Sequence, residues 1–155
     1  MIIAMLPYEL RKAAGESDSL FLYELKKIVL KDYVEKIWGW DEAVQLQYHA
    51  DNYHPEQTSI ILVNGTAAGT VEVQEDTEQF YICSLYLLPA WQGHGIGTRL
   101  VQQYLQQAQR QRKRLSLEVL PSNTRARQLY ERLGFLTRPA AENEMKIFMY
   151  KDYGL

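Results

Sequence analysis

The chain has 155 residues, of which 46% are hydrophobic and 23% charged, and its net charge at neutral pH is −2. This size and composition are typical of a globular protein, so we expect residues 1–155 to form a single domain. The small net charge suits neither nucleic acid nor an anionic membrane, and no apolar run is long enough to cross a bilayer. A lone cysteine, Cys83, excludes an internal disulfide. We therefore expect a cytoplasmic protein without nucleic-acid or membrane partners.

The first part of the chain is predicted to hold a short strand and two helices. Weak alternation of apolar and polar residues indicates a strand over residues 8–13. Apolar residues recur at helical spacing over 20–36, where Ser17 or Asp18 can cap the helix and a glycine three residues later ends it. A second helix is expected over 41–48, with the aspartate at its start as the cap.

Aromatic residues gather where the first predicted helix ends. Tyr33, Trp38 and Trp40 lie close together in the sequence. Such side chains can fill the core, and they can also line a substrate pocket, because loops held between two helices often do so. Both interpretations stay open, with Tyr33 and Trp38 as candidate substrate contacts.

The middle of the chain is predicted to form consecutive strands. Residues 58–63 and 66–74 have strand-like composition and are joined by Asn64-Gly65, a strong signal for a hairpin turn. A third apolar run, 80–88, ends at Pro89, which cannot donate to a sheet ladder. We expect the three strands to be successively antiparallel.

A glycine-rich loop joins the strand at 80–88 to a helix over 98–112. Gly93, Gly95 and Gly97 occupy alternate positions in this loop. Glycine allows positive φ and close approach of a ligand, and a helix N-terminus adds N–H groups and partial positive charge. These features are typical of a phosphate site, although a turn without a ligand fits the glycines alone equally well.

The spacing of this loop excludes two common phosphate motifs. A P-loop requires Gly-Lys-Ser/Thr at its end, whereas Thr98 and Arg99 follow Gly97. A dinucleotide fingerprint requires G-x-G-x-x-G, and neither Gly95 nor Gly97 has a glycine three positions later. The pattern that remains is Gln92-x-x-Gly95-x-Gly97.

The last third of the chain is predicted to alternate strands and helices. Residues 115–120 alternate with period two and complete a βαβ unit with the strand at 80–88, which favours parallel pairing. A helix is expected from Thr124 to a terminating Gly134. The remaining expected elements are a strand from Phe135, a polar loop over 139–144 and a strand over 145–150.

Two linked motifs resemble those of the GNAT superfamily of acyl-CoA-dependent N-acyltransferases. Gln92-x-x-Gly95-x-Gly97 resembles the Q/R-x-x-G-x-G/A loop that holds the pyrophosphate of coenzyme A in that family. Residues 123–135 are similar to the family pattern N-x-x-A-x-x-L-Y-E-x-x-G-F. The motifs stand in the expected order with a strand between them. The resemblance covers residues 58–150 well and the first 57 loosely.

The resemblance implies a fold and a set of cofactor contacts. The implied fold is a mixed α/β (α+β) domain, with a central, mostly antiparallel mixed sheet, a splayed parallel strand pair and helices on both faces. Acetyl-CoA is the implied cosubstrate, and no metal is expected. Asn123 is implied to bind the pantetheine amides of acetyl-CoA, and the alternative is that it serves only as a helix cap. The implied cofactor-binding residues are Leu85, Leu87, Gln92, Gly93, His94, Gly95, Ile96, Gly97, Thr98, Asn123 and Tyr130.

The resemblance also implies acetyl transfer to a primary amine of a small molecule or a protein, by direct attack in a ternary complex. Such a transfer requires a neutral amine, a polarised thioester carbonyl and a partner for the departing thiolate. The N–H of Leu87 is the candidate group for polarising the thioester carbonyl. The Tyr130 hydroxyl is the candidate for donating a hydrogen bond to the departing thiolate. The strand at 80–88 lacks the glutamate that many GNAT enzymes use as a base. Glu72 is therefore the first candidate base, and it is also a candidate substrate contact. Glu118 is the second candidate base.

Two rival hypotheses stay open beside the enzyme. An acyl-CoA-binding sensor or regulatory module would keep the loop without efficient catalysis, and an interaction domain would not bind coenzyme A. The resemblance also implies a possible homodimer, because members of the superfamily often dimerise through their C-terminal strands. Binding and turnover of acetyl-CoA separate the enzyme from its two rivals.

Overall fold

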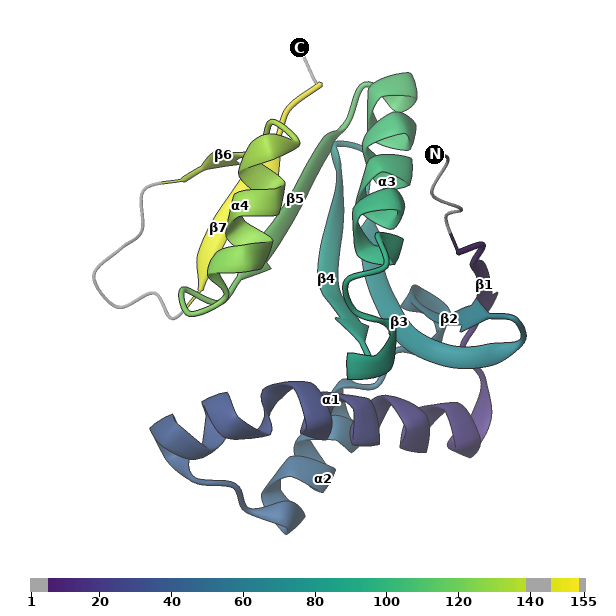
Figure 1. Ribbon diagram of the computed structural model, residues 1–155, viewed down its shortest axis with the longest axis vertical. Coiled ribbons are helices and arrows are strands. Elements are labelled where there is room, and N and C mark those ends of the chain that lie inside the picture. Colours follow the sequence, from purple (N-terminus) through teal and green to yellow (C-terminus); the bar gives the residue numbers. More distant parts are fainter. Residues whose placement is uncertain (1–5, 139–145, 154–155) are drawn as a thin grey trace. The chain divides into compact units, whose positions relative to one another are not determined.

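The computed structural model describes residues 6–138 and 146–153 (Figure 1). Within these ranges, seven strands form a mixed sheet in the order β1-β2-β3-β4-β5-β7-β6. The mixed α/β fold expected from the sequence is confirmed. In the same ranges, no helix combines the length and the apolar character that crossing a bilayer requires.

The chain divides into two compact units. The first comprises residues 1–72 and 85–96, and the second comprises residues 73–84 and 97–155. The expectation of a single domain over the whole chain stays a prediction.

The first unit is built on an antiparallel ladder. Strand β2 pairs with β1 on one side and with β3 on the other. Asn64 and Gly65 join β2 to β3 with φ of 52° and 77°, the positive values that a tight hairpin turn requires, so the predicted hairpin is confirmed. The elements that lie wholly or mostly in this unit are β1 (Glu9–Lys12), α1 (Gly15–Trp38), α2 (Glu42–Asn52), η1 (Pro55–Gln57), β2 (Thr58–Val63), β3 (Thr66–Glu75) and η2 (Pro89–Trp91).

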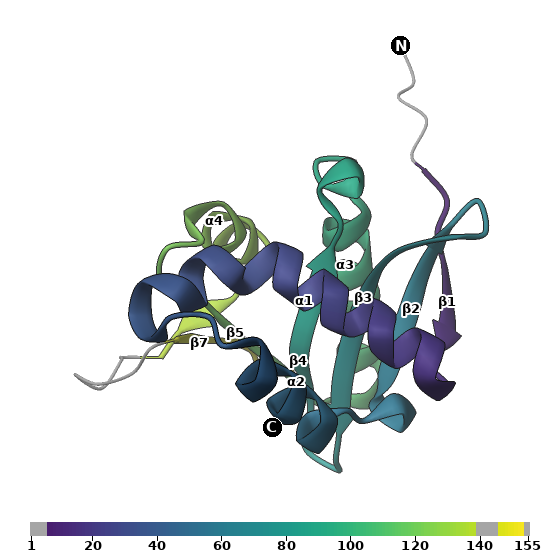
Figure 2. The same ribbon diagram turned by 90° about the horizontal axis from the view of Figure 1, so that it is seen from below.

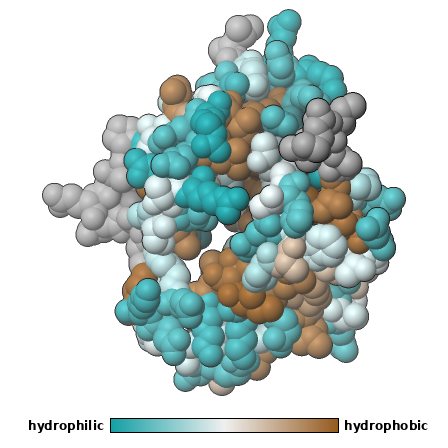
Figure 3. Space-filling model, in the orientation of Figure 1, coloured by the Kyte–Doolittle hydropathy of each residue, from teal (hydrophilic) through white to brown (hydrophobic). Residues whose placement is uncertain are grey.

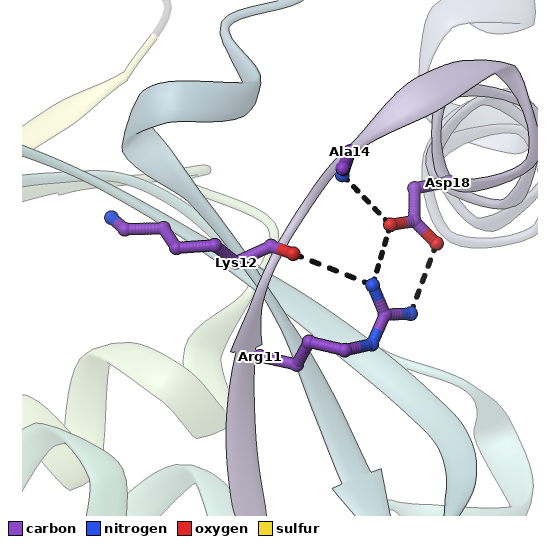
Figure 4. A network of polar contacts seen from close by, with 4 residues as sticks. All are labelled: Arg11, Lys12, Ala14 and Asp18. Carbon is purple, nitrogen blue, oxygen red and sulfur yellow. Dashed lines mark hydrogen bonds and ion pairs between the residues drawn. The ribbon is translucent and has the colours of Figure 1, made fainter.

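Helix α1 begins earlier than the sequence indicates, because Asp18 orders the chain that precedes it. The carboxylate of Asp18 accepts a hydrogen bond from the backbone N–H of Ala14 at 2.8 Å and pairs with Arg11 at 2.7 Å (Figure 4). The hydrogen bonds from Arg11 hold the pKa of Asp18 below its usual value. Ser17 and Asp18 lie inside the first turn, so the prediction that either is the N-cap residue is wrong.

Glu42 ties the start of α2 to α1 and to the loop between them. Its carboxylate accepts hydrogen bonds from Tyr23 Oη at 2.8 Å, Trp40 Nε1 at 2.8 Å and Lys27 Nζ at 3.2 Å. These bonds, led by that from Trp40, lower the pKa of Glu42 to about 2, while burial raises the pKa of Tyr23 to about 12. The predicted cap of α2 is confirmed, since the Asp41 side chain accepts from the N–H of Val44 at 3.0 Å.

Helix α1 lies across the ladder of the first unit. Figure 2 shows it passing in front of β1, β2 and β3. Leu22 and Leu25 of the helix are buried, as are the side chains of Ile60 and Val71 on the strands. Burial of these apolar side chains supplies the main stabilisation of the unit.

The second unit contains the predicted parallel strand pair. β4 pairs with β5 from Gln79↔Arg114 to Ile82↔Leu117 in parallel register, which confirms the βαβ interpretation. β7 pairs antiparallel with both β5 and β6. The predicted loop over 139–144 and the first residue of the last predicted strand lie outside the described residues. The elements are β4 (Gln79–Leu87), α3 (Ile96–Gln111), β5 (Arg114–Val119), α4 (Thr124–Arg132), β6 (Leu136–Thr137) and β7 (Ile147–Lys151).

Candidate functional site

The glycine-rich loop has the backbone conformation that its sequence predicts. Gly93 and Gly95 have φ of 80° and 78°, which other residues adopt only with strain. Gly97 already belongs to α3 and has no such φ. The side chain of Gln92, the first residue of the motif, donates to the carbonyl oxygen of Leu87 at 2.9 Å. The loop is thereby anchored to the end of β4.

Open space lies beside this loop. A Cβ atom built on Gly95 would meet no other atom within 4 Å, and Gly93, His94 and Gly95 are exposed. α3 starts at the next residue, Ile96, whose buried side chain fixes the position of the helix start. The N–H groups in the first turn of a helix have no partner within the helix, and with the open loop they form a place that fits a phosphate group.

The parallel ladder ends before its two strands do. Its last pair is Ile82↔Leu117, although β4 continues to Leu87 and β5 to Val119. The parallel pairing therefore covers only the first part of β4. Leu85 and Leu87, the candidate pantetheine contacts, are half-buried residues in the last part of β4.

Helix α4 carries the other two candidates for cofactor contact. The side chain of Asn123 accepts from the N–H of Ala126 at 3.2 Å, so its role as a helix cap is confirmed. Tyr130 is half-buried, with its ring 5.6 Å from that of Phe135. Burial raises the pKa of Tyr130, so its hydroxyl is protonated at neutral pH and is able to donate a hydrogen bond.

Glu72 is a half-buried carboxylate on β3 of the first unit. It lies opposite Thr58 in the β2–β3 ladder. Burial raises the pKa of Glu72, and electrostatic interactions with His54 and Lys26 oppose that shift. A carboxylate whose pKa is raised by burial is a stronger base than an exposed one, which is a property of many catalytic bases.

Lys26 is a functional candidate that sequence reasoning missed. It lies on α1 one turn after Leu22 and directly after Leu25, both of which are buried. Burial lowers the pKa of Lys26, and the charge of Glu72 raises it. The only sequence signal was a lysine within the apolar face of a helix.

The aromatic candidates differ in their surroundings. Trp38 is 65% exposed, so the interpretation as a core residue is wrong for it, whereas Tyr33 is half-buried. Trp40 is held by Glu42. Figure 3 shows hydrophobic side chains at the surface in the part of the view where α1 lies. The exposed large apolar residues of α1 and α2 are Leu20, Ile28, Val29, Ile37, Trp38, Val44, Leu46 and Tyr48.

No metal-binding group appears in the part of the chain that the structure describes. Among those residues, no three His, Cys, Asp or Glu side chains gather closely enough to hold an ion.

The family follows from a comparison with family models. The model of the acetyltransferase (GNAT) family matches residues 22–135. The chain belongs to this family. A comparison with curated protein sequences found no significant match.

Several solved structures share the fold. The PaiA N-acetyltransferase from Thermoplasma acidophilum, in complex with coenzyme A, is 18% identical with a TM-score of 0.71, over 96% of this chain and 100% of that one. The ribosomal-protein-S18-alanine N-acetyltransferase from Escherichia coli is 19% identical with a TM-score of 0.67, over 96% of each chain. Arabidopsis thaliana Naa50, in complex with the bisubstrate analogue CoA-Ac-MVNAL, is 17% identical with a TM-score of 0.64, over 94% of this chain and 98% of that one.

Proposed function

We propose that this GNAT protein is an N-acetyltransferase that moves an acetyl group from acetyl-CoA to a primary amine of a small molecule or a protein. The observation that carries the proposal is the loop before α3, with positive φ at Gly93 and Gly95 and open space at Gly95. Two similar solved structures contain coenzyme A or an analogue built on it, and two are named for a protein acceptor or bound to an analogue that carries a peptide. These relatives support the choice of cosubstrate and the inclusion of protein amines.

The acetyl-CoA contacts are divided among backbone and side-chain groups. N–H groups over residues 92–98 would bind the pyrophosphate, since this stretch combines an exposed loop with a helix start. The backbone of Leu85 and Leu87 would pair with the pantetheine arm as an added strand does. Asn123 would contact the pantetheine amides in addition to capping α4.

Alanine at Gly95 should weaken acetyl-CoA binding at least tenfold, because its Cβ would fill the space proposed for the pyrophosphate. Gly65→Ala is the matched control. Gly65 also has positive φ and open space around its Cβ, but it lies in the β2–β3 turn. Both variants should lose about 1 kcal/mol of stability, since each forces alanine into positive φ. Calorimetric titration with acetyl-CoA measures the difference.

Three outcomes of this titration are informative. Equal affinity for both variants would remove the loop from the binding site. Absence of binding by the unmodified protein would refute the proposed function and favour an interaction domain. Binding without release of thiol across a panel of amines and peptides would favour the acyl-CoA sensor.

Acetyl transfer needs a polarised thioester carbonyl, a partner for the departing thiolate and a base for the amine, and we assign one group to each. The N–H of Leu87 would polarise the thioester carbonyl, and the Tyr130 hydroxyl would donate to the thiolate as it departs. With reference pKa values of about 10 for a phenol and about 8.5 for a thiol, a hydrogen bond costs less than full proton transfer. Glu72 would accept the proton of the attacking amine, directly or through water.

Replacing Glu72 with glutamine should lower kcat/KM about tenfold at neutral pH and change it little at alkaline pH. A free alkyl ammonium titrates near pH 10.4, so at neutral pH the amine needs a base and at high pH it does not. The ionised carboxylate is the active form, so the kcat/KM of the unmodified protein should rise with pH through the raised pKa of Glu72. The pH dependence of kcat/KM checks this.

Glu118→Gln is the comparison variant for this measurement. Glu118 is the second candidate base and lies exposed on β5. The Glu118→Gln variant should keep the rise of kcat/KM with pH. If this rise is lost in Glu118→Gln and kept in Glu72→Gln, then Glu118 and not Glu72 is the base.

A further inference from the structure

Helix α2 packs on the first unit through one buried side chain, and that side chain is a histidine. The structure describes every residue of α2, and only His49 among them is buried, with 6% of its surface exposed. Apolar residues of the same helix lie at the surface, since Val44 and Tyr48 are 59% and 62% exposed. Little apolar burial therefore holds α2 in place, and the contacts of His49 are central to its attachment.

The imidazole of His49 lies among side chains of α1 and of the residue that follows α2. Its Nε2 atom is 3.0 Å from Ser19 Oγ on α1. Its ring centroid is 5.5 Å from that of Tyr23 on α1 and 5.6 Å from that of Tyr53, with which it stacks at 28°. Its Nδ1 atom is buried and has no hydrogen-bond partner among the described residues. Ser19, Tyr23, His49 and Tyr53 together form what we call the α1–α2 joint.

This environment suits the neutral ring better than the charged one. A neutral imidazole with its proton on Nε2 can donate to the Ser19 hydroxyl, and its Nδ1 is then an acceptor without a proton. An imidazolium has donors at both nitrogens, and the Nδ1–H of a charged His49 would be buried without an acceptor in the described part of the chain. A buried, charged and unpaired donor costs far more free energy than a buried neutral acceptor.

We propose that His49 makes the α1–α2 joint a proton-sensitive switch, in which the neutral ring holds α2 against α1 and protonation in mild acid releases α2 while the β1–β2–β3 ladder stays folded. Release also frees the connection at residues 39–41, which follows Trp38, a candidate substrate contact. The switch needs no acetyl transfer, so it stands independently of the proposed function.

The groups around the joint add to the cost of protonation. Burial lowers the pKa of His49, and the electrostatic interaction with Lys26 of α1 lowers it further, while the hydrogen bond with Ser19 opposes both. The other titratable or charged groups that contact the ring or act on its neighbours are Arg11 of β1, Asp18, Tyr23 and Glu24 of α1, Glu42 of α2, Tyr53, and Glu56 of η1.

The second tie between the helices does not titrate in mild acid. Tyr23 Oη donates to Glu42 at 2.8 Å, and their pKa values of about 12 and about 2 keep this bond unchanged between pH 7 and pH 5. Since the pKa of His49 is lowered in the folded state, the released state takes up the proton first, so release becomes easier as the pH falls below about 6.5. Glu72 has the opposite effect, because its raised pKa favours the folded state as the pH falls.

Amide hydrogen exchange measures the release of α2. Protection factors, which are corrected for the intrinsic effect of pH on exchange, are compared at pH 7 and pH 5 for residues 46–52 and for β2. His49→Phe keeps a ring between the two tyrosines, and His49→Gln keeps a polar group near Ser19, but neither can take up a proton. His54→Gln is the matched control, because His54 is exposed and lies 3.6 Å from Glu56, Nδ1 to Oε1.

We expect the protection of α2 to fall about tenfold from pH 7 to pH 5 in the unmodified protein and in His54→Gln. The protection of β2 should stay within about twofold. Neither His49 variant should show the fall in α2. Nitrogen NMR of the imidazoles should find His49 neutral with its proton on Nε2 at pH 7, and still neutral at pH 6, where an ordinary histidine is mostly charged.

Three results of the exchange experiment would overturn the switch. The first is an α2 protection that does not change with pH in the unmodified protein. The second is a fall that persists in both His49 variants. The third is an equal fall in α2 and β2, which would mean that the whole unit opens in acid. If neither variant folds, the nitrogen spectra decide, since a His49 that is charged at pH 6 while α2 stays protected refutes the proposal.

Discussion

Replacing Tyr130 with phenylalanine should lower kcat about 100-fold and leave the affinity for acetyl-CoA within about twofold. The hydroxyl is proposed to donate only to the sulfur that gains charge as the thioester bond breaks, so its loss raises the barrier and not the binding free energy. Phenylalanine keeps the ring that packs near Phe135. Single-turnover kinetics and calorimetry measure the two quantities, and the thermal midpoint should stay unchanged.

Tyr150→Phe is the matched control for this variant. Tyr150 is a half-buried tyrosine of β7 in the same unit, and its ring lies under the Arg114 guanidinium at 4.6 Å, a contact that phenylalanine keeps. It should retain full kcat. Unchanged turnover in Tyr130→Phe would remove this hydroxyl from the mechanism, and an equal loss in both variants would indicate a general effect on the unit.

Valine at Gly69 should destabilise the protein by about 3 kcal/mol or more. A Cβ atom at this position would collide with the carbonyl oxygen of Tyr86 and lie 2.9 Å from Leu87 Cδ2 and 3.1 Å from Leu87 Cα. The strand cannot easily move aside, because the N–H of Leu88 donates to the carbonyl oxygen of Ala68 at 2.9 Å. Glycine is therefore required here by the close approach of β4, and not by its φ.

Strand propensity alone predicts the opposite result for this variant. Valine is favoured in strands and glycine is disfavoured, so propensity would make Gly69→Val stabilising. Urea unfolding of Gly69→Val and of Ala67→Val, at a half-buried position two residues earlier on β3, distinguishes the two expectations. The control should stay within about 1 kcal/mol of the unmodified protein. A similar small change in Gly69→Val would show that β3 and β4 can separate at low cost.

Local backbone chemistry explains which features were predictable. The Asn64-Gly65 turn, the Asp41 cap, the positive φ of Gly93 and Gly95 and the end of α4 near Gly134 all depend on residues a few positions apart. Each is a short-range requirement for a particular φ or a particular hydrogen-bond partner, and a sequence motif records it directly. The family motifs are of this kind, so the family and its loop were visible without coordinates.

The amino-acid sequence by itself thus determined the order of the elements, the glycine loop and the membership of the GNAT family. Only the tertiary structure decided what surrounds Glu72, why Gly69 has no side chain, and that Asp18 holds the chain before α1 while Glu42 contacts the middle of that helix. The physical reason is separation along the chain. Lys26 and Glu72 are 46 positions apart, and Gly69 and Tyr86 are 17 apart. Electrostatic and steric effects depend on distance in space, which packing sets and no local pattern records.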